Sequence, residues 1–112
     1  MAVALEELYH EIEPLYDIRL VTTSCFDKII EWTHIVENPE FIKLLHGNEL
    51  IFNAGLQFDS DEWLLDFVRQ LNDAGAGGMV LSLHDGKRYS ERVLEYCNEN
   101  HFPLFAAGWN TP

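Results

Sequence analysis

Three apolar stretches decide the fold of this chain: LIFNA at residues 50–54, MVLSL at residues 79–83 and PLFAA at residues 103–107. Each has the length of a strand and almost no polar side chains, which is typical of strands covered on both faces. The segments between them carry apolar residues at helical spacing, from Trp63 to Leu71 and from Val93 to Cys97. This alternation of strand and helix predicts parallel strands joined by right-handed crossovers.

Residues before position 49 add further elements to this pattern. A helix is expected at Leu5–Ile12 and ends before Pro14, and strands are expected at Ile18–Thr22 and Glu31–Val36. Asn38 followed by proline has the form of an N-cap and first helical position, so another short helix begins there. The order of the first two strands in the sheet stays open. The expected fold is α/β, a single three-layer domain over residues 1–112, with a mostly parallel sheet of about five strands and helices on both faces.

Helix starts are also predicted at two later positions. Asp59 and Glu62 form a pair similar to a capping box, and Ser90 can cap the last helix. Gly47 can end the short helix that begins at Asn38 with a left-handed residue.

The charge of the chain excludes several classes of partner. Nineteen acidic residues against seven basic ones give a formal net charge of −12. Binding to DNA or to an anionic membrane needs clustered Lys and Arg, so neither partner is expected for this chain.

The cysteines and the apolar runs indicate the compartment. Cys25 and Cys97 do not form a CxxC pair, and two thiols cannot supply the disulfide framework of a small secreted domain. The N-terminus lacks the basic start of a signal peptide, and no apolar run approaches the roughly 20 residues that cross a bilayer. A soluble, cytoplasmic setting is therefore expected.

Four segments of the sequence, the first of which is the second predicted strand and the residues after it, together resemble those of a known family. They are EWTHIVENPEF (31–41), HGNELIFNAGL (46–56), LNDAGAGGMVLSL (71–83) and NHFPLF (100–105). Because these four segments occur in this order, the chain resembles the N-terminal regulatory domain of PucR-type transcription regulators, the purine catabolism regulator family. The resemblance implies a sensor domain of a bacterial regulator whose DNA-binding helix-turn-helix lies outside these residues. It also implies an effector that is a purine-breakdown product or another nitrogenous metabolite.

Candidate ligand-binding residues follow from the topology, because ligands of open α/β sheets bind outside the carboxyl ends of the strands. This rule selects residues that follow four predicted strands: Glu37, Asn38, Asn53, Gly55, His84 and Trp109. Asn53 can donate to and accept from a heterocycle or a ureide, and Gly55 lets the backbone approach a ligand. The alternative is that Asn53 satisfies a neighbouring loop and Gly55 only makes a turn. Glu37 could neutralise a cationic effector or accept its N–H groups, or it could be a solvated residue.

Other polar residues are assigned structural roles. Glu49 is expected to cap a helix end or to bind loop amides. The five histidines form no HxH, HExxH or HxxxH motif, so no metal and no cofactor are expected. Glycines 75, 77 and 78 lie between a helix and a strand, the reverse of the order in a phosphate-binding loop.

Three hypotheses on function remain. The first is a non-catalytic sensor domain that binds a small-molecule effector. The second is a dimerisation or protein-interaction module that binds no ligand, with a homodimer as its simplest form. The third is a small hydrolase that uses Cys25 and His34, which is disfavoured because the sequence shows no nucleophile elbow and no oxyanion loop. The chain is therefore not expected to be an enzyme.

Overall fold

A computed structural model describes residues 2–84 and 87–108 of the chain. The helices and strands are, in chain order, β1 (Val3–Ala4), α1 (Leu5–Ile12), β2 (Ile18–Leu20), β3 (Ile29–Ile30), β4 (Trp32–Ile35), the 3₁₀ helix η1 (Pro39–Leu44), β5 (Glu49–Asn53), α2 (Asp61–Asp73), β6 (Gly78–Ser82), α3 (Glu91–Glu99) and β7 (Leu104–Ala107). No helix in this described part is both long enough and apolar enough to cross a membrane.

The main sheet has five strands in the order β2-β7-β6-β5-β4. Strands β4, β5, β6 and β7 run parallel to one another, which confirms the three parallel strands predicted after residue 48. Strand β2 is antiparallel to β7, with Ile18 opposite Ala107 and Leu20 opposite Phe105. The sheet is therefore mixed, and the prediction of its strand directions holds only in part. The direction of β2 depends on a partner more than 80 positions away in the sequence, which no local pattern reports.

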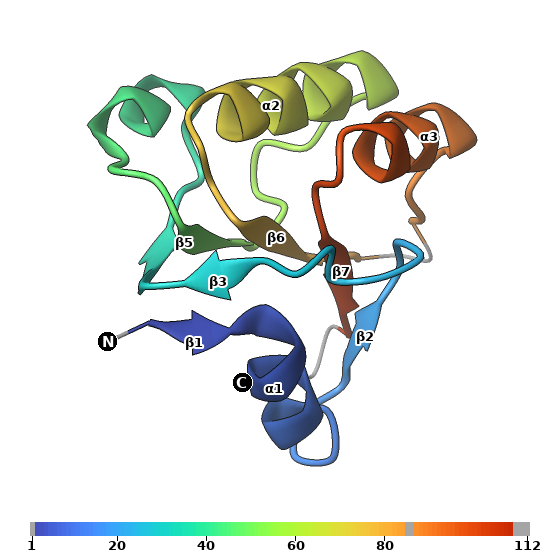
Figure 1. Cartoon of the computed structure of the whole chain (residues 1–112). Coiled ribbons are helices and arrows are strands. Elements are labelled where there is room, and N and C mark those ends of the chain that lie inside the picture. Colours follow the sequence, from blue (N-terminus) through green and yellow to red (C-terminus); the bar gives the residue numbers. More distant parts are fainter. Residues whose placement is uncertain (1, 85–86, 109–112) are drawn as a thin grey trace.

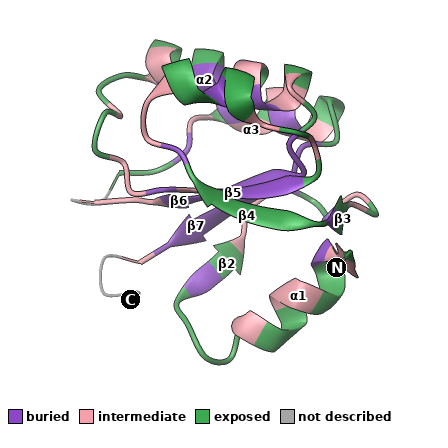
Figure 2. Ribbon diagram, turned by 90° about the vertical axis from the view of Figure 1, so that its left-hand side faces the viewer, coloured by how far each residue is buried: buried purple, intermediate pink, exposed green. Residues whose placement is uncertain are grey.

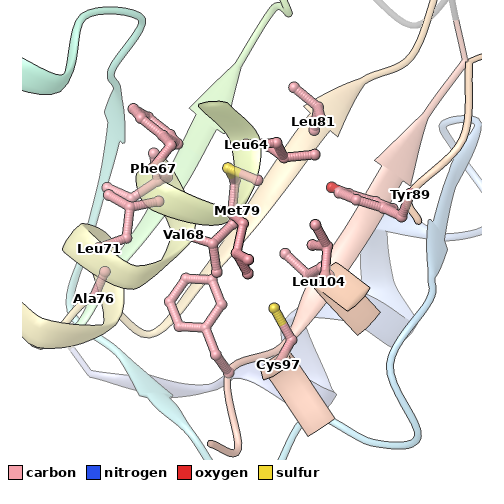
Figure 3. Packing of buried hydrophobic residues seen from close by; sticks show 14 of the residues in the cluster. Leu64, Phe67, Val68, Leu71, Ala76, Met79, Leu81, Tyr89, Cys97 and Leu104 are labelled. Atoms are coloured by element: carbon pink, nitrogen blue, oxygen red, sulfur yellow. The ribbon is translucent and has the colours of Figure 1, made fainter. Parts of the chain in front are cut away.

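Helices α2 and α3 lie side by side over one face of the sheet (Figure 1). Alternate residues of each strand point to this face. Figure 3 shows Met79 and Leu104 from the strands among Phe67 and Val68 of α2 and Cys97 of α3. This is the larger hydrophobic core of the molecule, and its residues follow the predicted periodicity of both helices.

The opposite face of the sheet carries α1 and the small β1–β3 pair (Figure 1). Leu5 of α1 packs here with Leu50, Val80 and Phe105 in a second, smaller cluster. Most of α1 is exposed or half-buried, whereas α2 presents a buried side to the sheet (Figure 2). This face is therefore less completely covered than the other.

The helix N-caps agree with the sequence at two positions and differ at one, and the predicted end at Gly47 is wrong because η1 ends at Leu44 with Leu45 as its C-cap. Asn38 accepts a hydrogen bond from the Glu40 amide and Ser90 accepts one from the Val93 amide, as predicted. The predicted cap at Asp59 is wrong, because Ser60 is the N-cap of α2 and accepts from the Trp63 amide at 3.1 Å. Both residues have capping side chains, and spacing alone did not distinguish them.

Two short strands were not predicted. β1 and β3 have two residues each and pair through Val3 with Ile30 and Ala4 with Ile29. Segments of this length carry no periodicity, so the sequence gives no signal for them.

Candidate functional site

An open pocket of about 790 Å³ lies at the carboxyl ends of the parallel strands, on the face of the sheet that α1 covers incompletely. All five strands of the main sheet contribute to it, together with the end of α1 and the residues after it. It is lined by Ile12, Tyr16, Ile18, Thr33, His34, Ile35, Glu37, Phe52, Asn53, Ala54, Val80, Ser82 and Ala107. The volume falls within the range of about 300–1,000 Å³ that is usual for small-molecule sites.

The floor of the pocket is apolar and is set by the register of the strands. Ile35 lies opposite Phe52, and Phe52 lies opposite Val80, so three side chains form a row across β4, β5 and β6. One step further along, Ala107 lies between Ser82 of β6 and Ile18 of β2. A flat ring could lie on this surface with its polar edge toward the strand ends.

Glu37 is the acidic residue of the pocket. It follows β4 by two positions, and the alternation of side chains along the strand places it on the same face as Ile35. Its Oε2 accepts a hydrogen bond from the Ala54 amide at 2.6 Å, which ties the end of β4 to the loop after β5. Its Oε1 is buried and has no hydrogen-bond partner within the described chain. A buried oxygen without a partner is uncommon in folded proteins and points to a ligand or solvent contact.

Asn53 is buried, with 3% of its surface exposed, and its amide already serves the fold. Its Nδ2 donates to the Val36 carbonyl at 3.0 Å, and its Oδ1 accepts from the Gly55 amide at 2.7 Å. Asn53 therefore joins the ends of β4 and β5 and shapes the loop that follows. Asn53 lines the pocket, but these two hydrogen bonds give it the structural role in the loop that the sequence analysis named as the alternative.

Gly55 and His84 lie beside this loop but do not line the pocket. Gly55 has φ +78°, and a Cβ at this position would lie 2.8 Å from the Ser82 carbonyl oxygen. The ring Nε2 of His84 lies 2.6 Å from the Ala54 carbonyl oxygen. Both residues bring the loop after β5 against the end of β6, so they act on the pocket through Ala54 and Ser82.

The two remaining predicted residues have different outcomes. Asn38 caps η1 and does not line the pocket. Trp109 lies outside the described residues. Of the six predicted ligand-binding positions, the structure therefore brings Glu37 and Asn53 to one pocket, with Gly55 and His84 behind its wall.

The wall formed by Ile12, Tyr16 and Ile18 was not predicted. The strand-end rule applies to parallel strands, and β2 is antiparallel, so its amino end lies among the carboxyl ends of the others. The pairing of β2 with β7 would have been needed to find these residues.

Glu49 has the structural role that the sequence favoured. Its buried carboxylate accepts hydrogen bonds from the amides of His46 and Gly47, at 2.5 and 2.9 Å. The loop before β5 is thereby held against the start of that strand.

The pair proposed for a hydrolase is not brought together. His34 lines the pocket described above, whereas Cys25 lines a separate, smaller one of about 270 Å³ beside α1. Burial raises the pKa of the Cys25 thiol, and the nearby Glu6 adds to this shift, so the thiolate is disfavoured. Within the described residues, no three His, Cys, Asp or Glu side chains form a group that could hold a metal ion.

A comparison with models of protein families matches most of the chain. The family model described as the purine catabolism regulatory protein-like family matches residues 11–112. The matched segment includes every residue that lines the pocket, from Ile12 to Ala107. No curated protein matches the chain.

Proposed function

We infer that this chain, which belongs to the purine catabolism regulatory protein-like family, acts as a regulatory domain that senses a small molecule. The effector we propose is a purine-breakdown product or a related nitrogenous metabolite. The domain would report its ligand to the rest of a transcription regulator and catalyse no reaction itself. Since such a regulator acts where the DNA is, we also propose a cytoplasmic location.

The observation that supports this proposal is the pocket across the strand ends. It combines an apolar floor with Glu37, whose buried Oε1 has no partner among the described residues. Pockets of this kind, mostly apolar with a few convergent polar groups, are the usual form of a small-molecule site. Its position outside the carboxyl ends of parallel strands is the usual one for an α/β sheet.

A ligand in this pocket would contact two parts of the molecule at once. Ile12 and Tyr16 come from α1 and the turn after it, whereas Phe52 and Val80 belong to the centre of the sheet. A ligand changes a conformational equilibrium only if it binds one state more tightly than the other. Contacts that join α1 to the sheet would favour the state in which α1 is docked, and this supplies a means of signalling.

Thermal-shift and calorimetric titrations test the proposal. Hypoxanthine, allantoin, urate and allantoate would each be added to the wild-type protein and to Ser82→Phe, in which a ring fills part of the pocket. Leu44→Phe is the matched control, since Leu44 is exposed and does not line the pocket. At least one compound should raise the melting temperature of the wild type and of the control. The affinity of Ser82→Phe for that compound should be at least about tenfold lower than that of the wild type. Absence of binding by all four compounds would contradict a purine-metabolite sensor.

A second candidate function is a homodimerisation module, and the edge of the sheet favours it. β4 is an edge strand without a charged residue, and its Trp32 and Ile35 are 57% and 80% exposed. Phe41 and Leu44 of η1 are also exposed. Edge strands without charges or a cover are ready to pair with another chain.

Light scattering over a concentration series separates the two candidates. A dimer that dissociates on Trp32→Lys and is indifferent to the four metabolites would favour the interaction module. A monomer at all concentrations would exclude self-association through β4.

A further inference from the structure

We propose that the pocket selects its ligand by charge: it accepts a neutral or cationic molecule that donates an N–H group to Glu37 Oε1, and it rejects anions. This inference rests on the sensor function proposed above and narrows the chemical class of the effector. An amide, an amidine or a protonated amine attached to a flat apolar body fits the description.

The first argument is the unequal use of the two Glu37 oxygens. Oε2 is engaged by the Ala54 amide at 2.6 Å, which fixes the direction of the carboxylate. Oε1 is buried and has no partner in the described part of the chain, and Glu37 is one of the residues that line the pocket. Leaving a charged acceptor unsatisfied is costly, so a donor from the ligand would be bound strongly.

The second argument is the shortage of positive charge around the pocket. No lysine or arginine is among the described lining residues, and the whole chain has a net charge of −12. His34 also lines the pocket, but it is exposed on the edge strand β4 and lies opposite Ile51, whose side chain belongs to the core on the other face of the sheet. A ligand carboxylate near Glu37 would therefore meet a like charge without a compensating cation.

The third argument is the shape of the surface beside Glu37. Ile35, Phe52 and Val80 form an apolar row, and Thr33 and Ser82 supply hydroxyl groups at its border. Hydroxyl groups can donate or accept, so they do not restrict the charge of the ligand. The restriction on ligand charge therefore comes from Glu37, whose carboxylate can only accept hydrogen bonds.

Three probes of nearly equal shape test the proposal: benzamidine, benzamide and benzoate, which are cationic, neutral and anionic. Each would be titrated by calorimetry into the full chain at pH 8. Wild-type protein should bind benzamidine most tightly, about tenfold better than benzamide, since hydrogen bonds to a charged group are the stronger ones. Benzoate should not bind measurably.

Glu37→Gln provides the decisive variant because its two ends differ. The Gln carbonyl must face the Ala54 amide to keep that hydrogen bond, so the NH₂ group then faces the pocket as a donor. The preference for benzamidine should be lost, and benzoate, whose carboxylate can accept from that NH₂ group, should gain binding relative to the wild type. Glu40→Gln is the control, since it removes the same charge from an exposed side chain outside the pocket, and it should keep the wild-type order.

Equal binding of benzoate and benzamidine, or an unchanged order in Glu37→Gln, would overturn the selection by charge while leaving the pocket as a ligand site. Failure of all three probes to bind would also overturn it, and the metabolite titrations would then decide separately whether the sensor function stands.

Discussion

Gly55 is held by two constraints at once. Its φ of +78° is unfavourable for a residue with a Cβ, and a Cβ there would lie 2.8 Å from the Ser82 carbonyl oxygen. Its amide also donates to Asn53. The loop that carries Ala54 into the pocket therefore depends on the absence of a side chain at this residue.

We expect Gly55→Ala to lower the free energy of unfolding by about 2–3 kcal/mol, since backbone strain and the steric clash add. Gly75→Ala is the matched control: its φ is +84°, but a Cβ there would meet its nearest neighbour at an ordinary 3.5 Å. The control should lose only about 1–2 kcal/mol. Urea denaturation of both variants measures the difference, and equal losses would show that the contact with Ser82 is unimportant.

Cys97 makes the free energy of unfolding fall as the pH rises in the alkaline range. Burial raises the pKa of its thiol to about 12, from an ordinary value near 9. The unfolded chain therefore releases this proton first, so the contribution of Cys97 is complete below pH 9 and is lost as the pH rises toward 12.

Urea denaturation at pH 8, 9 and 9.5 checks this dependence. The wild type should lose stability over this range, by up to about 1.4 kcal/mol per pH unit for one thiol, and Cys97→Ala should lose less. The range stays below pH 10 because burial also raises the pKa of Tyr89, which would act in the same direction above that value. Parallel curves for the two proteins would contradict the assignment.

Individual residues differ in how far the sequence reveals their roles. Glu37 could be placed at the site because its position after an apolar strand is a local feature. Asn53 could be placed there too, but its bonds to Val36 and Gly55 depend on contacts between strands and could not be predicted. The free Oε1 of Glu37 is likewise a property of the folded chain.

At the scale of elements, α2 begins at a cap that the structure identifies as Ser60. We expect Ser60→Ala to lower the free energy of unfolding by about 1 kcal/mol, because the Trp63 amide loses its acceptor. Asp59→Ala is the control and should change stability by less than about 0.5 kcal/mol, as surface substitutions usually do. Thermal unfolding of both variants measures this, and a larger loss in Asp59→Ala would restore the cap first predicted.

Elements with a strong pattern were predicted and weaker ones were not. β5, β6 and β7 are apolar and flanked by amphipathic helices, so their parallel arrangement followed from the sequence. β1 and β3 are too short to show a period, and the direction of β2 depends on its pairing with β7. The short helix after Asn38 was expected, but nothing in its sequence distinguished a 3₁₀ helix from an α-helix.

The whole molecule is asymmetric about its sheet. One face is covered by α2, α3 and the larger core, whereas α1 covers only part of the other (Figure 2). The pocket occupies the part left open, between the end of α1 and the edge strand β4. The pocket exists because the helices cover the two faces of the sheet unequally. The sequence predicted only the strand ends that border it.

A titration followed by amide NMR tests the pocket most directly. Hypoxanthine and allantoin would be added in turn to ¹⁵N-labelled protein, and shifts of the backbone amides would be recorded. We predict changes concentrated at Glu37, Ala54, Ser82 and Ala107, with the amides of α2 and α3 unchanged. Shifts centred on α2 and α3, or no shifts with either compound, would contradict a ligand site at the strand ends.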